Sequence, residues 1–136
     1  MVQGLDARAT AVIRDMKLVT TIPVLRIFDE AKAHEFYVGF LGFTVEWQHR
    51  FTDDLPLYQS LQRDGVELHL SEHHGDACPG AQVRIEVEDI EALHAELTGK
   101  NYKFARPGLE AMPWGMREVR VGDPFGNRIT FAEGMT

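Results

Sequence analysis

The sequence predicts a single α+β domain built from two copies of one β-α-β-β-β module. Short segments of alternating apolar and polar residues recur along the chain, and each half also contains one segment with helical spacing. The two halves align at an offset of about 60 residues. A chain of 136 residues suffices for one domain and is too short for two ordinary ones. Because neither half would bury its apolar face alone, we expect the modules to pack together.

The composition argues against several partners. The formal net charge is −7, and phosphate binding needs clustered Lys and Arg, so we expect no nucleic acid. An acidic surface is compatible with a cationic small molecule. No apolar run approaches the length of a membrane span, and the N-terminus does not resemble a secretion signal. The single cysteine, Cys78, fits a reducing compartment, so the expected location is the cytoplasm.

The first module is predicted over residues 20–76, after an N-terminal helical extension (1–19) that rests on apolar spacing in residues 7–17. Asp29 is the expected N-cap of its helix, which follows a first strand. The buried side of this helix is expected to consist of Ala33, Phe36, Tyr37 and Phe40. The strands are expected at residues 20–28, 43–50, 57–62 and 66–71, with a tight hairpin at residues 63–65.

The second module is predicted over residues 80–134. Its first strand covers residues 82–88, and Asp89 caps a helix that buries Ile90, Leu93 and Leu97. A short strand is expected at residues 102–105, followed by a loop through Met112. Two strands then surround the turn at residues 123–127, where Pro124, Gly126 and Asn127 suit turn geometry.

Several segments of this doubled plan resemble the vicinal oxygen chelate, or glyoxalase/bleomycin-resistance, superfamily. The resemblance covers about residues 20–133 and implies a glyoxalase/bleomycin resistance/dioxygenase-like fold with half-barrel sheets. The segments that carry it are Pro23-Val24-Leu25 with Asp29, Phe36-Tyr37, Leu41-Gly42-Phe43, Arg63-Asp64-Gly65-Val66-Glu67-Leu68, Val87-Glu88-Asp89-Ile90 and Asp123-Pro124-Phe125-Gly126-Asn127.

Within the superfamily, the chain is most similar to the antibiotic-binding bleomycin resistance proteins. Ile22-Pro23-Val24-Leu25 resembles their first strand, and residues 113–118 resemble their Pro-Trp-Gly-Arg-Glu stretch with Met116 inserted. The resemblance implies a homodimer with two grooves, in which a flat part of the drug stacks between a tryptophan and an aromatic residue of the other chain. These two positions correspond to Trp114 and Tyr58. Trp114, between Pro113 and Gly115, fits either a core plug or the wall of a ligand site.

The enzymes of the superfamily hold a metal ion at set strand positions. In this chain, the resemblance places Ile22, Gln82 (or its neighbour) and Thr130 at three of them. Isoleucine has no lone pair and threonine is a poor ligand for a divalent ion. We therefore expect no metal and no cofactor. His69, Glu72, His73 and His74 form a second cluster, for which a solvated loop is the simpler interpretation.

Other residues are candidates for the ligand site. Trp47 alternates with Phe43 and Val45, which favours the core, although it is also a candidate for ligand contact. His49 has the reach of a general base, but no nucleophile is identified beside it. Arg117 and Glu118 are expected to pair across strands. The remaining ligand-site candidates are Glu72 at the groove mouth, Gly115 beside Trp114, and Phe125 at a hairpin tip, where a dimer contact is the alternative.

These inferences predict a metal-free protein that sequesters a flat, cationic antibiotic of the bleomycin type, with no bond made or broken. Two alternatives stay open. One is a metal-dependent lyase, isomerase or dioxygenase of the same superfamily, with ligands in other places such as His69 and Glu72. The other is a protein that binds a different metabolite, because one fold serves many functions.

Overall fold

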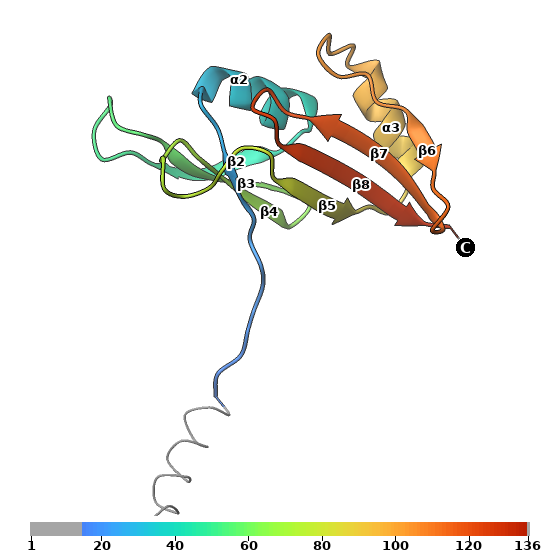
Figure 1. Cartoon of the computed structure of the whole chain (residues 1–136), viewed down its shortest axis with the longest axis horizontal. Coiled ribbons are helices and arrows are strands. Elements are labelled where there is room, and N and C mark those ends of the chain that lie inside the picture. The colour runs from blue at the N-terminus through green and yellow to red at the C-terminus, as the bar shows by residue number, and fades with distance from the viewer. Residues whose placement is uncertain (1–14, 136) are drawn as a thin grey trace, which may run out of the picture.

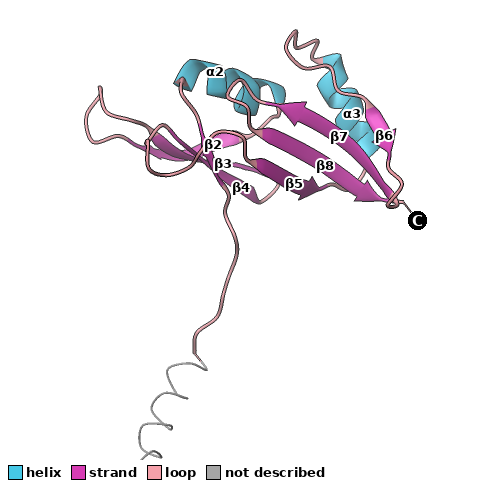
Figure 2. Cartoon of the chain, viewed as in Figure 1, coloured by secondary structure: helices cyan, strands magenta, loops and turns pink. Residues whose placement is uncertain are grey.

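The computed structural model describes residues 15–135, which form two successive modules of the same plan (Figures 1 and 2). The first module contains β1 (Val24–Arg26), α2 (Glu30–His34), the π-helix η1 (Glu35–Phe40), β2 (Thr44–His49), β3 (Tyr58–Arg63) and β4 (Val66–Ser71). The second contains β5 (Gln82–Glu86), α3 (Ile90–Gly99), β6 (Leu109–Ala111), β7 (Met116–Gly122) and β8 (Arg128–Gly134). Each module therefore reads β-α-β-β-β, as the sequence predicts.

The described residues form two four-stranded sheets with the same strand order. The first runs β1-β4-β3-β2 and the second runs β5-β8-β7-β6. In each sheet the first strand of the module is parallel to the last, and the other neighbours are antiparallel. The predicted doubling, and with it the predicted fold class, is confirmed. The predicted module boundaries themselves stay a prediction.

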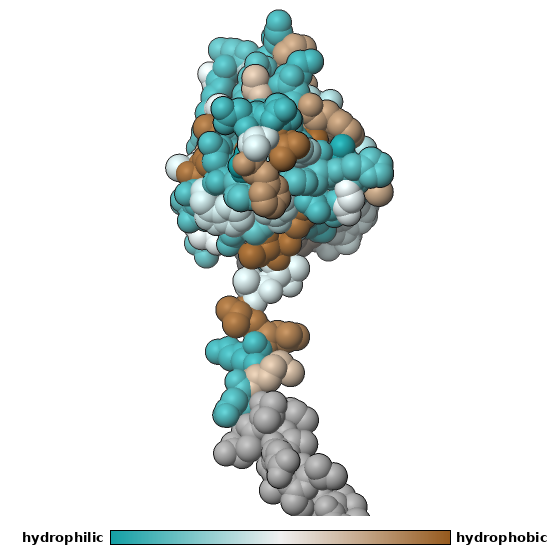
Figure 3. Space-filling model, turned by 90° about the vertical axis from the view of Figure 1, so that its left-hand side faces the viewer, coloured by the Kyte–Doolittle hydropathy of each residue, from teal (hydrophilic) through white to brown (hydrophobic). Residues whose placement is uncertain are grey.

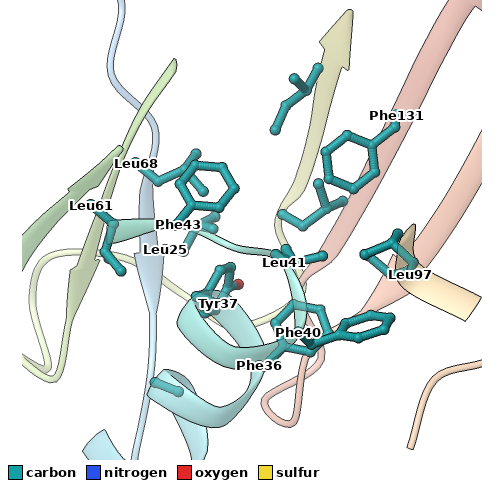
Figure 4. Packing of buried hydrophobic residues seen from close by; sticks show 14 of the residues in the cluster. Leu25, Phe36, Tyr37, Phe40, Leu41, Phe43, Leu61, Leu68, Leu97 and Phe131 are labelled. Carbon is teal, nitrogen blue, oxygen red and sulfur yellow. The ribbon is translucent and has the colours of Figure 1, made fainter. Parts of the chain in front are cut away.

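The helices of both modules lie on the same side of the two sheets, and the hydrophobic core lies between the helices and the sheets (Figure 1). Figure 4 shows Phe36, Tyr37 and Phe40 of η1 between leucines of the first sheet and residues of the second module such as Phe131. Ala33, Phe36, Tyr37 and Phe40 are all buried, as are Ile90, Leu93 and Leu97 of α3. Burial of one continuous apolar cluster explains why the modules fold together.

Local signals fix the ends of these elements. The side chain of Asp29 accepts a hydrogen bond from the backbone N–H of Lys32, and that of Asp89 accepts one from Ala92. Both predicted N-caps are therefore confirmed. In the predicted turn at residues 123–127, the Asp123 carboxylate accepts from the backbone N–H groups of Phe125 and Asn127 at 2.8 Å. The Asp123 side chain thus accepts hydrogen bonds from backbone N–H groups that have no strand partner in the turn.

One predicted strand is wrong. Residues 102–105 contain a turn at Lys103 and Phe104 and no strand, and the edge strand β6 lies at Leu109–Ala111, inside the predicted loop. The ring of Tyr102 stacks on that of Phe40 with centroids 4.8 Å apart, so the apolar residues of this segment pack on η1 without forming a strand. Four residues are too few for alternation to separate a strand from such a packed turn.

The start of the described range stands off the body. Residues 16–23 have no regular structure, and the side chains of Met16, Leu18 and Val19 are exposed. Figure 3 shows hydrophobic residues both on this segment and on the adjacent end of the body. The predicted N-terminal helix lies mostly outside the described residues. Among the described helices, none has the length and apolar character that crossing a membrane requires.

Candidate ligand-binding site

Each sheet has one face turned away from the helices, which we call its open face. Leu61, Leu68 and Leu70 point into the core, so alternation places their neighbours on the opposite side. The open face of the first sheet carries Trp47, Tyr58, Ser60, Glu67 and His69. The open face of the second sheet carries Arg84, Glu118, Arg120 and Thr130.

The expectation of a core position for Trp47 is wrong. Val45 pairs with Leu61, but Trp47 pairs with Ser60, so Glu46 is an extra residue in a β-bulge. One extra residue reverses the alternation, which moves the indole from the helix side to the open face. Trp47 is 48% exposed there.

On the open face of the first sheet, three rings form a compact cluster. The rings of Trp47 and Tyr58 stack with centroids 5.9 Å apart and planes 13° apart. The His69 ring packs edge-on against both, at 5.2 Å from Trp47 and 5.3 Å from Tyr58. Neighbouring strands thus present one aromatic surface, which suits the face of a flat ligand.

Hydrogen bonds hold this cluster in place. The Tyr58 hydroxyl lies 2.7 Å from Nδ1 of His69, and His69 Nε2 lies 2.8 Å from Oε2 of Glu67. The same Glu67 oxygen accepts from the Ser60 hydroxyl at 2.9 Å. These hydrogen bonds, with the imidazole first, hold the pKa of Glu67 below its usual value. Burial raises the pKa of Tyr58, and the carboxylates of Asp76 and Glu67 add to this rise. The phenol therefore stays protonated at neutral pH.

Trp114 lies in the turn between β6 and β7. Gly115 has φ +84°, a left-handed conformation that suits glycine, and its N–H bonds the carbonyl of Met112. The indole is 59% exposed, which rules out the core plug. Its Nε1 donates to Oε2 of Glu118 at 2.9 Å, so the ring is fixed while remaining accessible.

Glu118 is the buried centre of the second open face, and sequence reasoning misplaced its contacts. Its side chain has 0% exposure and accepts from Arg84 at 2.9 Å and from Arg120 at 3.0 Å. Burial alone would raise the pKa of this carboxyl, but hydrogen bonds from Trp114, Arg84 and Arg120 lower it below its usual range. The predicted pairing with Arg117 is wrong, because adjacent strand residues point to opposite faces and Arg117 binds Glu91. Because Arg84 follows the inward-facing Val83 and Arg120 follows the inward-facing Val119, alternation along the strands could have placed both arginines on this face.

His49 lies opposite Tyr58 in the register of β2 and β3, so it is also on the open face of the first sheet; it is exposed, and its ring packs against Phe51 with centroids 4.7 Å apart. The other predicted site residues are spread more widely. Glu72 accepts a hydrogen bond from the backbone N–H of Leu57 at 2.9 Å and lies 3.6 Å from the Arg50 guanidinium, so its carboxylate is already engaged. Phe125 is half-buried, with its ring 6.0 Å from that of Phe28. It therefore packs between the modules.

The three positions at which the resemblance predicts metal ligands do not fit a metal ion here. Ile22 precedes β1 and offers no donor atom. Gln82 pairs with Arg128, and Thr130 lies between Arg84 and Arg120 across three adjacent strands. Cationic neighbours oppose binding of a divalent cation. Within residues 15–135, no three His, Cys, Asp or Glu residues are grouped so as to hold a metal ion.

A cavity of about 580 Å³ lies elsewhere, between the β3–β4 hairpin and α3. It is lined by Phe43, Arg63, Asp64, Val66, Ile85, Glu86, Val87, Glu88, Asp89, Ala92, Leu93, Glu96 and Phe131. None of the predicted ligand-binding residues lines it. Arg63 and Glu96 bind each other there at 2.8 Å through two hydrogen bonds, so its charged rim links the two modules.

Comparisons with known proteins agree with this fold. A bleomycin-binding protein from bleomycin-producing Streptomyces verticillus, solved with copper(II)-bleomycin, is 30% identical in sequence to this chain. The structures match with a TM-score of 0.65, and the match covers 88% of this chain and 98% of the other. Another bleomycin-binding protein, complexed with bleomycin, gives 18% identity and a TM-score of 0.66 over 86% of this chain and 99% of its own. An antibiotic-binding protein from Streptomyces sp. CB03234 gives 21% and 0.64, over 88% and 99% respectively.

Sequence comparison with curated proteins found no match. A family model described as "Glyoxalase superfamily protein" matches residues 6–136, nearly the whole chain. The doubled module, the sheet order and this match lead to one conclusion: the chain belongs to the glyoxalase superfamily.

Proposed function

We propose that this protein is a metal-free binding protein that sequesters a flat, cationic antibiotic of the bleomycin type. The observation that carries the proposal is the pair of accessible aromatic surfaces, Trp47 stacked on Tyr58 in the first sheet and Trp114 in the turn between β6 and β7. The likeness to bleomycin-binding proteins supports it. Stacking contributes roughly 0.5–1.5 kcal/mol per aromatic pair beyond burial of area.

The charges beside Tyr58 support a cationic ligand. The negative charges of Asp76 and Glu67 help to raise the pKa of the Tyr58 phenol. A cation lying over the Tyr58 ring would be attracted both by the ring face and by these two carboxylates. In this proposal, two copies of the chain form the groove, with Tyr58 from one and Trp114 from the other. Binding removes the drug from solution without chemistry, so no residue has a catalytic role.

Calorimetric titration with bleomycin tests the proposal. We expect saturable binding at micromolar drug, and loss of at least about tenfold in affinity in Trp114→Ala and Tyr58→Ala. The matched control is Phe104→Ala, because Phe104 is an exposed aromatic residue (68%) in the turn after α3. No binding at micromolar drug, or equal binding by all variants, would refute sequestration.

Two further measurements address the remaining parts of the proposal. Sedimentation equilibrium is expected to give a dimer, and a monomer that binds drug equally well would contradict the shared groove. Elemental analysis of the purified protein separates this proposal from a metal-dependent enzyme. A stoichiometric divalent ion would favour the enzyme.

A further inference from the structure

The open face of the second sheet has a charge pattern that the proposed antibiotic site does not explain. Arg84 and Arg120 both pair with Thr130 of β8, so the three residues form one row across β5, β8 and β7. The side chains of Arg84 and Arg120 are 48% and 51% exposed. The indole of Trp114 is fixed to the same carboxylate as both arginines.

We propose that this row is an anion subsite, in which Arg84 and Arg120 bind a carboxylate, sulfonate or phosphate group of a ligand whose flat ring lies on Trp114. The inference rests on the proposed function, because it assigns a charge pattern to the ligand of the same groove. The first sheet receives the cationic part of the ligand and the second sheet the anionic part.

Hydrogen bonds to Glu118 hold the two guanidinium groups of this subsite in place. One fully buried carboxylate holds two guanidinium groups, so the three groups together keep one positive charge. Among the described residues, Arg84 uses only Nη2 for its hydrogen bond, and Arg120 uses Nε and Nη2. A guanidinium has five N–H donors, so others remain for a ligand. Planar guanidinium groups fixed by a carboxylate are well suited to bind an oxyanion through paired hydrogen bonds.

The acidic residues of this face are placed so that they permit an anion. Glu118 and Glu86 both lie opposite Ala132, and the exposed Glu110 of β6 lies opposite Glu118, so the three form one acidic row next to the row of the arginines. Glu118 has its oxygens occupied by Trp114, Arg84 and Arg120. A third arginine, Arg128, stands in the row on the other side, paired with Gln82. The row at Thr130 is therefore the most cationic part of the face, which also explains why a divalent ion does not fit there.

The test compares two probes of the same shape, the anion 2-naphthoate and the neutral 2-naphthamide, by calorimetric titration. We expect 2-naphthoate to bind at least about tenfold more tightly, since hydrogen bonds between charged groups are stronger than neutral ones. In Arg84→Gln/Arg120→Gln the preference is expected to disappear. Arg117→Gln is the matched control, because Arg117 binds Glu91 on the helix side and is expected to leave the preference unchanged.

Equal affinity for both probes, no binding of either, or a preference that persists without Arg84 and Arg120 would overturn the subsite. The double variant leaves Glu118 buried without its cationic partners, so it needs a folding check by circular dichroism. If it unfolds, Arg84→Gln/Glu118→Gln/Arg120→Gln removes the whole charged group and takes its place. Bleomycin titration of the wild-type protein keeps the two proposals apart: drug binding without a naphthoate preference refutes the subsite alone, and a naphthoate preference without drug binding refutes the antibiotic.

Discussion

The hydroxyl of Tyr37 donates a hydrogen bond of 2.7 Å to Oδ2 of Asp123, although the two residues lie 86 positions apart. Tyr37 belongs to the helix of the first module, and Asp123 begins the β7–β8 turn of the second. Both are buried, and Asn127 adds a second link by donating from Nδ2 to Asp123 and to the carbonyl of Arg26. This polar link within an apolar core fixes how the modules sit against each other.

Replacement of Tyr37 by Phe tests the strength of this link. The ring and its packing stay, but the buried carboxylate loses one donor. We expect a loss of roughly 1–3 kcal/mol in the free energy of unfolding, measured by urea denaturation. Tyr102→Phe is the control, because Tyr102 is only half-buried and its loss is expected to be smaller. Equal losses would mean that the Tyr37–Asp123 bond is not special.

The same residue predicts a dependence on alkaline pH. Burial, the charge of Asp123 and the hydrogen bond to it raise the pKa of Tyr37 above its ordinary value of 10.0. Below pH 10 the phenol is protonated in both states, so the stabilisation is fully present. Above pH 10 the unfolded chain ionises this phenol and the folded protein does not, so stability falls as the pH rises. Urea unfolding between pH 8 and 11 is expected to show a steeper decline in the wild type than in Tyr37→Phe. Parallel declines would contradict the raised pKa.

The β-bulge at Glu46 predicts opposite fates for two aromatic residues of one segment. Phe43 is 3% exposed in the core, whereas Trp47 is 48% exposed on the open face. Phe43→Ala is expected to cost about 3–5 kcal/mol, because it leaves a cavity. Trp47→Ala is expected to cost less than half of that. If thermal denaturation gave similar costs, Trp47 would be a core residue and the reversal of alternation would be wrong.

Gly42 and Arg63 form a close contact that a methyl group would disturb. Gly42 has φ +80°, and an added Cβ would lie 2.9 Å from Nη1 of Arg63, which Glu96 and the carbonyl of Leu41 hold in place. Gly42→Ala is expected to destabilise by more than Gly65→Ala, where φ is +82° but nothing lies within 4 Å. Backbone strain costs about 1 kcal/mol at either site, and the excess at Gly42 measures the contact with Arg63. The measurement is chemical denaturation, and equal losses would exclude such a contact.

Local patterns were sufficient for most elements of this protein. Asp29 and Asp89 as caps, the turn at Asp123 and the buried positions of both helices follow from hydrogen bonding and periodicity within a few residues. The doubled order of elements then predicts the two sheets. The predicted strand at residues 57–62 contains Tyr58, as β3 does, although the role of Tyr58 in binding stays a prediction.

The sequence by itself determined the two modules, their caps and turns, and the lack of donor atoms at Ile22, because these depend on residue type and local spacing. Only the tertiary structure decided that Trp47 faces outward and that Glu118 holds Arg84 and Arg120. A single bulge reverses every later side chain of a strand, and a contact between strands depends on their register. Neither is encoded in the spacing along one segment.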